Sequence, residues 1–97
     1  MKRVLLLLVL ATGLLGAQPQ GTVTVRNGTT CDLYIVVNGR NQGMLAASSY
    51  NSYQTSLGDI KVEAYKGYST NDPYAKKWVR LSASYPTGEV DFSNYDF

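Results

Sequence analysis

Apolar and polar residues alternate with a period of two along most of the chain that follows the apolar first segment. The clearest case is the stretch 60–66, in which Ile60, Val62 and Ala64 alternate with charged or aromatic residues. Successive side chains of a strand point to opposite faces of the sheet, so this alternation predicts one face in the core and one face in water. Tyr65 is expected on the outer face.

The same pattern, interrupted by turn residues, recurs along the chain. It predicts short strands at 22–26, 32–37, 40–46, 50–55, 60–66, 77–85 and 89–92. Asn38-Gly39 is the strongest hairpin signal, because both central residues of a type I′ turn need positive φ. Seven short strands with no helical period predict an all-β fold, namely a small antiparallel β-sandwich.

The alternation also predicts which side chains of the other strands share a face. The residues expected on the core side are Val23, Val25, Leu33, Ile35, Val37, Val79, Leu81 and Ala83. Tyr34 and Trp78 fall on the opposite faces of their strands. Several aromatic rings are therefore expected away from the main core.

The first seventeen residues have the three parts of a secretory signal peptide. Lys2 and Arg3 precede an apolar run that closes on Gly16-Ala17, and cleavage is expected after Ala17. The run from Val4 is fourteen residues long, whereas a membrane-spanning helix needs roughly 20. We therefore interpret 1–17 as a signal peptide and 18–97 as one β-sandwich domain with a short aromatic C-terminal tail.

Export places the mature domain in the periplasm, at the cell surface or outside the cell, with no membrane span after cleavage. Gln18 stands where a bacterial lipoprotein would need a cysteine, so release is favoured over a lipid anchor.

Cys31 is the single cysteine. It is expected to be buried as a small apolar residue, the alternative being an intermolecular disulfide.

Charge and composition remove several classes of function. Residues 18–97 hold seven basic and seven acidic side chains, and this zero net charge offers little attraction for phosphates, so no nucleic-acid partner is expected. The chain has no histidine. Without histidine it cannot form a histidine relay or a histidine-ligated metal site, and with one cysteine it cannot form a cysteine cluster. We therefore expect no enzyme activity, no metal and no cofactor.

Two stretches resemble a known family. Tyr34-Ile35-Val36-Val37-Asn38-Gly39-Arg40-Asn41-Gln42-Gly43 has a strand, an Asn-Gly hairpin and a second glycine, and a Leu-Gly-Asp turn at 57–59 leads to a strand followed by Gly67-Tyr68. This arrangement is similar to the PEGA-type β domains of bacterial and archaeal surface proteins. The resemblance implies a small Ig-like or PEGA-like sandwich without catalytic activity at the cell surface.

The high number of tyrosines is the most unusual feature of this composition, with eight in 97 residues. Tyrosine and tryptophan combine a large apolar ring with a polar tip, and they are enriched where a surface meets a protein or a sugar. The candidate binding surface consists of Tyr34, Tyr65, Tyr68, Tyr74 and Trp78. The alternative is that these rings form cross-strand pairs that stabilise the sheet.

Three other motifs have a simpler interpretation. Glu89 and Asp91 have the spacing of two carboxylates on one strand face, but such pairs are common on solvated strands, so a glycoside hydrolase pair is not expected. Lys76-Lys77 is interpreted as a guard against edge-to-edge aggregation. The segment 27–29 matches an N-glycosylation pattern but is interpreted as a turn.

Together these features predict an exported interaction module without enzyme activity. It is expected to bind a protein or to self-assemble through strand edges and tyrosines. Two alternatives are a carbohydrate-binding module, and a small secreted hydrolase inhibitor that presents the loop 67–74.

The leader gives a direct prediction. When the full chain is expressed in a bacterial host, the exported product is expected to begin at Gln18, because the signal ends in small residues. N-terminal sequencing of the purified product measures the cleavage site. Ala17→Leu is the matched variant and is expected to slow cleavage, whereas an exported product that retains Met1 would contradict the interpretation.

Overall fold

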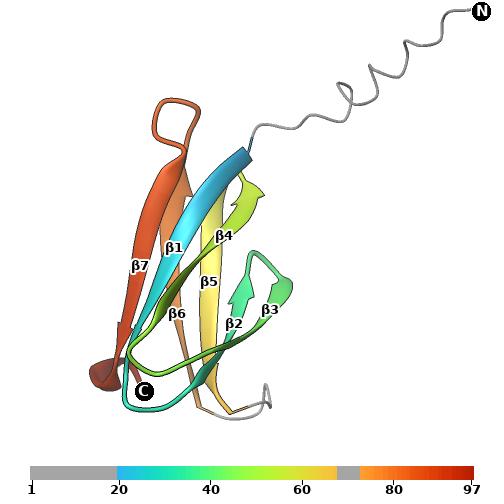
Figure 1. The fold of residues 1–97 in the computed structure, drawn as a ribbon. Coiled ribbons are helices and arrows are strands. Elements are labelled where there is room, and N and C mark those ends of the chain that lie inside the picture. The colour runs from blue at the N-terminus through green and yellow to red at the C-terminus, as the bar shows by residue number, and fades with distance from the viewer. Residues whose placement is uncertain (1–19, 68–72) are drawn as a thin grey trace, which may run out of the picture.

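The computed structural model describes residues 20–67 and 73–97 (Figure 1). These residues form seven strands in two sheets and one short 3-10 helix. The prediction of an all-β sandwich with about seven short strands is confirmed. The expected leader, 1–17, and the candidate residue Tyr68 lie outside the described residues.

The first sheet has three strands. β1 (Gln20–Gly28) is central, with β4 (Tyr50–Ser56) on one side and β7 (Thr87–Ser93) on the other. β4 pairs with β1 in the antiparallel sense, whereas β7 pairs with β1 in parallel. The sequence predicts antiparallel strands. Side chains alternate in the same way in parallel and antiparallel strands, so the sequence pattern does not indicate the parallel pairing of β7 with β1. β7 is followed by the 3-10 helix η2 (Asn94–Asp96).

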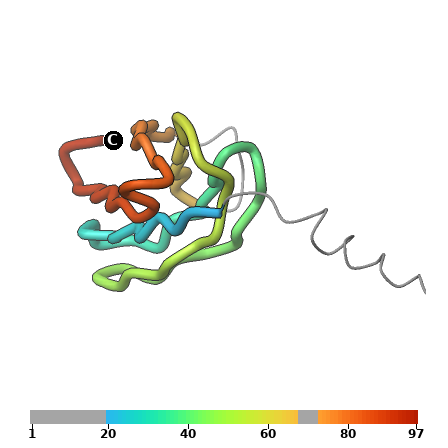
Figure 2. The backbone as a smooth tube through the Cα atoms, turned by 90° about the horizontal axis from the view of Figure 1, so that it is seen from above, coloured from blue at the N-terminus to red at the C-terminus, as the bar shows by residue number. Residues whose placement is uncertain are grey.

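The second sheet has four strands, all paired in the antiparallel sense. Their spatial order is β3 (Arg40–Leu45), β2 (Leu33–Val37), β5 (Gly58–Lys66) and β6 (Tyr74–Leu81). The β2–β3 hairpin turns at Asn38 and Gly39, with φ of 51° and 84°, as the type I′ prediction requires. In both views this hairpin lies across the molecule from the C-terminal segment (Figures 1 and 2).

The core lies between the two sheets. Side chains that alternate inward from both sheets fill it, and the largest fully buried apolar ones are Phe92, Leu33, Ile35, Ile60, Leu81, Val23, Val25, Val37 and Val62. Most of the predicted inward residues are therefore confirmed. Cys31 is a free, half-buried cysteine that packs against the edge of this core.

The strand predicted at 77–85 is misplaced. β6 begins at Tyr74 and ends at Leu81, and Ala83, which was expected on the core side, is exposed. Ser82 and Tyr85 exchange two backbone hydrogen bonds of 3.1 and 3.0 Å, which turn the chain before Pro86. These local bonds end the strand four residues earlier than the alternation alone suggests.

Asn27, at the end of β1, connects the two sheets and is completely buried. Its side-chain Nδ2 donates to the backbone oxygens of Leu45 at 3.0 Å, Cys31 at 2.9 Å and Ala46 at 3.2 Å. Its Oδ1 accepts the backbone N–H of Thr29 at 2.9 Å and the Thr29 hydroxyl at 2.6 Å. The turn prediction for this segment is thus explained, and the amide nitrogen is not accessible for glycosylation in the folded chain.

The C-terminal tail packs on the domain that carries it. Ser93 caps η2 by accepting the N–H of Tyr95, and Asp96 accepts the N–H of Ser93 in return, which is a capping box. Phe97 then packs against the core, with its ring centroid 6.4 Å from that of Phe92. The tail therefore covers the end of the sandwich between β6 and β7.

The burial of Asn27 gives a stability prediction. Asn27→Ala is expected to lower the free energy of unfolding by about 3 kcal/mol, because the backbone oxygens of Leu45 and Ala46 and the backbone N–H of Thr29 lose their side-chain partner. Urea titration followed by tryptophan fluorescence measures this difference. Asn41→Ala, at an exposed position of β3, is the matched control and should cost less than about 1 kcal/mol.

Candidate functional site

Three of the predicted tyrosines lie in one row across the outer face of the four-stranded sheet. Tyr34 of β2 is opposite Tyr65 of β5, and Tyr65 is opposite Tyr74 of β6. The Tyr65 and Tyr74 rings stack with centroids 5.2 Å apart. We call this outer face, defined by Tyr34, Tyr65, Tyr74 and Trp78, the aromatic face.

Tyr65 points outward, as its strand predicts, but little of its surface is accessible. The residue is only 9% exposed, the Tyr74 ring stacks on its ring, and its hydroxyl donates to Glu63 at 3.3 Å. Burial, followed by the charge of Glu63, raises the pKa of Tyr65 above its ordinary value. Tyr34 is half-buried in the same row. Tyr65 and Tyr74 thus form a stacked cross-strand pair.

The accessible part of the aromatic face lies on β6. Tyr74 is 50% exposed and Trp78 is 62% exposed. They lie on the same side of the strand, four residues apart, which corresponds to about 13 Å. Lys76 projects between them, and Lys61 is the cross-strand neighbour of Trp78. This part of the surface therefore offers two rings with charged groups beside them.

Three further exposed aromatic residues were not among the sequence candidates. Tyr50, Tyr85 and Tyr95 are 64%, 77% and 98% exposed. Tyr85 lies between β6 and β7 and Tyr95 lies in η2, where strand alternation gives no assignment. Tyr50 begins β4, and the Arg26 guanidinium lies 5.1 Å from its ring centroid. The position of Tyr50 at the first residue of a polar strand could have indicated its exposure.

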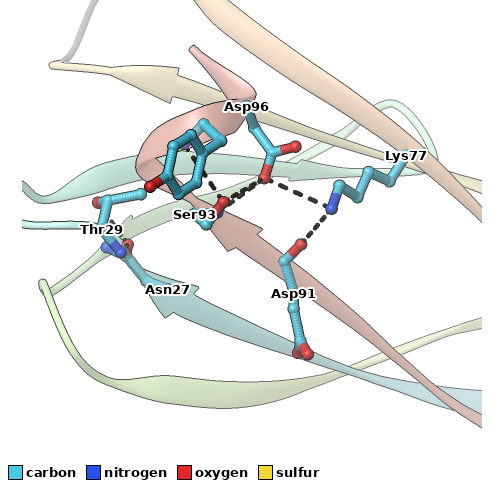
Figure 3. Close-up of polar contacts among 7 residues, drawn as sticks. Asn27, Thr29, Lys77, Asp91, Ser93 and Asp96 are labelled. Carbon is cyan, nitrogen blue, oxygen red and sulfur yellow. Dashed lines mark hydrogen bonds and ion pairs between the residues drawn. The ribbon is translucent and has the colours of Figure 1, made fainter.

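The sandwich has two open sides, and the side between β6 and β7 is closed by a polar contact. The side chain of Lys77 points from β6 toward β7, where its Nζ donates to the backbone oxygen of Asp91 at 2.6 Å (Figure 3). The same Nζ forms an ion pair with Asp96 at 3.4 Å and lies 5.6 Å from the ring centroid of Phe92. An inward-pointing lysine on an edge strand prevents pairing with another chain.

Four strands lie at sheet edges, and three of them carry features that discourage pairing. β6 and β7 bear charges, and β3 begins with Arg40 and contains a bulge at the Ile35/Val36 step of its pairing with β2. β4 has the sequence Tyr-Asn-Ser-Tyr-Gln-Thr-Ser, without charge or proline, and its register with β1 is continuous over seven residues. Among the described strands, β4 is the edge with the least protection.

The backbone groups that point to the open side of β4 can be identified. In an antiparallel pair, alternate residues direct their N–H and C=O toward the partner strand. The Asn27 N–H donates to Ser49 O at 2.8 Å, so Ser49 and every second residue along β4 face β1. The residues between them, which face the open side, are Tyr50, Ser52, Gln54 and Ser56. The Ser52 N–H donates to Asn51 Oδ1 at 2.9 Å.

A polar groove of about 540 Å³ lies beside the second half of β4. It separates β4 from the β2–β3 turn, and Asn38 Nδ2 donates across it to Ser56 Oγ at 3.5 Å. The residues that line it are Gln20, Asn38, Arg40, Gln54, Thr55 and Ser56. We call the open side of β4 together with this groove the β4 edge.

The two carboxylates Glu89 and Asp91 lie beside the same cation. Glu89 and Asp91 share the outer face of β7, where Arg26 lies 3.0 Å from Glu89 and 3.7 Å from Asp91. The hydrogen bond from Arg26 is the main reason that the pKa of Glu89 lies below its ordinary value, whereas a general acid needs a raised pKa. Among the described residues, no group of three potential metal ligands lies together.

Comparisons with known proteins give no relative. The chain matches no protein-family model, no curated protein and no solved structure. In the described part of the chain, no helix has the length and apolarity needed to cross a membrane. In the absence of a relative, we base the proposed function on two surfaces of the structure, the β4 edge and the exposed part of the aromatic face.

Asp96 gives a prediction for pH. The backbone N–H of Ser93, followed by the nearby charge of Lys77, lowers the pKa of Asp96. A carboxyl with a depressed pKa stabilises the fold above its unfolded-state pKa of about 3.9, and this contribution is lost as the pH falls through the folded-state pKa. Asp96→Asn should therefore cost about 1–2 kcal/mol at pH 7.

Urea titrations of both proteins at several pH values measure this contribution. The difference between them is expected to shrink as the pH falls below about 4. A difference that stays constant down to pH 2 would show that the charge of Asp96 does not stabilise the fold.

Proposed function

We propose that this chain is an exported interaction module without enzyme activity, which binds a protein by adding a strand at the β4 edge. Strand addition uses the free backbone groups of a sheet edge for affinity and neighbouring side chains for specificity. The single observation that carries the proposal is the lack of charge, proline and bulge on β4, while the other three edges have at least one of these features.

The neighbourhood of β4 supports this function. Gln54 and Ser56 direct their N–H and C=O groups to the open side, and both residues also line the groove. The exposed Arg40 lies across this groove. An incoming strand would thus meet backbone partners on β4 and hydrogen-bonding side chains on the β2–β3 turn.

The location of the module follows from the leader. A signal peptide at 1–17 would deliver residues 18–97 to the periplasm, the cell surface or the medium. The PEGA-like features of 34–43 and 57–68 agree with a surface domain that has no catalytic role. The mixed charge of the domain favours a protein partner over nucleic acid.

Glycan recognition is a second candidate, and one observation favours it. Tyr74 and Trp78 expose half or more of their surface on one side of β6, with Lys61 and Lys76 beside them. Stacking on such rings, with hydrogen bonds from charged neighbours, suits a linear sugar chain. The inhibitor alternative depends on the loop 67–74, most of which lies outside the described residues.

The test uses the exported protein, immobilised and incubated with an envelope fraction. Gln54→Pro removes an N–H that faces the open side and leaves the β1–β4 ladder intact, so captured protein should fall at least tenfold. Gln54→Thr is the matched control, because it keeps the N–H, and it should capture as the unmodified protein does. Quantitative mass spectrometry measures the captured protein.

The same experiment separates the two candidates. Trp78→Ala should leave protein capture unchanged if the β4 edge is the binding surface. If Gln54→Pro has no effect on capture while glycan-array binding is present and lost in Trp78→Ala, protein binding by strand addition is wrong and the glycan candidate replaces it.

A further inference from the structure

We infer that the strand added at the β4 edge is β4 of a second copy of this chain, in an antiparallel pair about a twofold axis through Tyr53. This inference rests on the proposed function and names its partner. It joins the three-stranded sheets of two molecules into one continuous sheet. Charge, register, side chains and interface size each bear on it.

Charge favours self-pairing at this edge. Like charges that face each other across two strands are destabilising. A second copy of β6 would oppose Lys76, Lys77 and Arg80 with the same positive charges, and β7 would oppose Glu89 and Asp91 with negative ones. β4 has no ionisable group except tyrosine, so two copies of it meet without repulsion.

The register satisfies the free backbone groups. With Tyr53 on the twofold axis, Ser52 is opposite Gln54 of the second copy, and Tyr50 is opposite its Ser56. These are the residues whose N–H and C=O point to the open side. Each outward group on one strand thus meets an outward group on the other, as a hydrogen-bonded antiparallel pair requires.

The side chains in this register are also compatible. Ser52 would contact an amide from Gln54 of the second copy on the outer face of the sheet. The existing ladder contains a similar pair, since the hydroxyls of Thr24 and Ser52 lie 2.9 Å apart. Such polar cross-strand pairs contribute modestly to sheet stability. No position of the register buries a charge without a partner.

Asn51 controls access to the edge in the free molecule. Its Oδ1 accepts the N–H of Ser52 at 2.9 Å, and this N–H is needed by the second copy. Asn51 is exposed, so its side chain can turn away from the strand. In the paired register it comes opposite Thr55 of the second copy, beside the groove, where polar side chains are available to it.

The size of the contact predicts a reversible complex. A single pair of seven-residue strands buries less than the roughly 1,200 Å² of a standard stable interface. The dissociation constant is therefore expected in the range of about 10 µM to 1 mM. High local concentration at a cell surface would favour the paired state by mass action.

Sedimentation equilibrium of the exported protein, from about 10 µM to 1 mM, tests the inference. A monomer–dimer equilibrium is expected for the unmodified chain and for Gln54→Thr. Gln54→Pro is expected to weaken association at least tenfold, and Asn51→Ala to strengthen it several-fold because the Ser52 N–H becomes free. Circular dichroism shows whether each variant remains folded.

A charge pair provides a test that does not depend on proline. The double variant Ser52→Lys, Gln54→Lys places lysines opposite each other, so it should be monomeric, as should Ser52→Glu, Gln54→Glu. A mixture of the two should form a heterodimer. Thr87→Lys, which adds one positive charge to the edge strand β7, is the control and should dimerise as the unmodified protein does.

Three results would overturn the inference. They are a monomer across the whole concentration range, a dimer that Gln54→Pro leaves unchanged, and a mixture of charged variants that stays monomeric. If the protein is monomeric but still captures another protein in a Gln54-dependent way, the second copy is wrong and strand addition stands. If neither association nor capture depends on Gln54→Pro, both proposals fail.

Discussion

The fold depends on the hydrogen bonds of one buried side chain, Asn27. Two stacked sheets can slide over an apolar interface, because the hydrophobic effect has no preferred direction. Asn27 removes this freedom at one end of the sandwich, since it belongs to β1 of the first sheet and its side-chain amide donates to the backbone oxygen of Leu45 in β3 of the second sheet. The chain from Thr29 to Cys31, which crosses between the sheets, is held by the same amide. This contact fixes the end of β3 relative to the end of β1.

The two open sides of the sandwich differ in the residues that line them. On the side of β6 and β7, Lys77, Asp96 and the ring of Phe97 close the gap and place a charge in it. On the side of β3 and β4, the strands diverge after a short turn, and polar uncharged residues line the space between them. A sandwich of this size has no disulfide in its described part to stabilise it. Its charges protect one side from contact and leave the other side available.

Much of this fold could be predicted from the sequence, because strand faces and hairpin turns depend on residues that are close together in the chain. Alternation at 22–26 and 60–66 places side chains on the correct faces, and Asn38-Gly39 identifies the hairpin. The site could be predicted only in part. Trp78 is accessible as expected, but Tyr65 is covered by Tyr74, which pairs with it only because β6 begins three residues earlier than the pattern suggests. The exposure of the β4 edge depends on sheet order, which is a long-range property that no stretch of the chain encodes alone.

The parallel pairing of β1 and β7 has a mechanical consequence. Because both strands run in the same direction, the chain enters β1 at one pole of the domain and leaves β7 at the other (Figure 1). A tensile load applied between these poles would shear the ladder of β1 and β7 along its length. All of its hydrogen bonds would then bear the load together, whereas in a hairpin pulled from its open end they would break one after another.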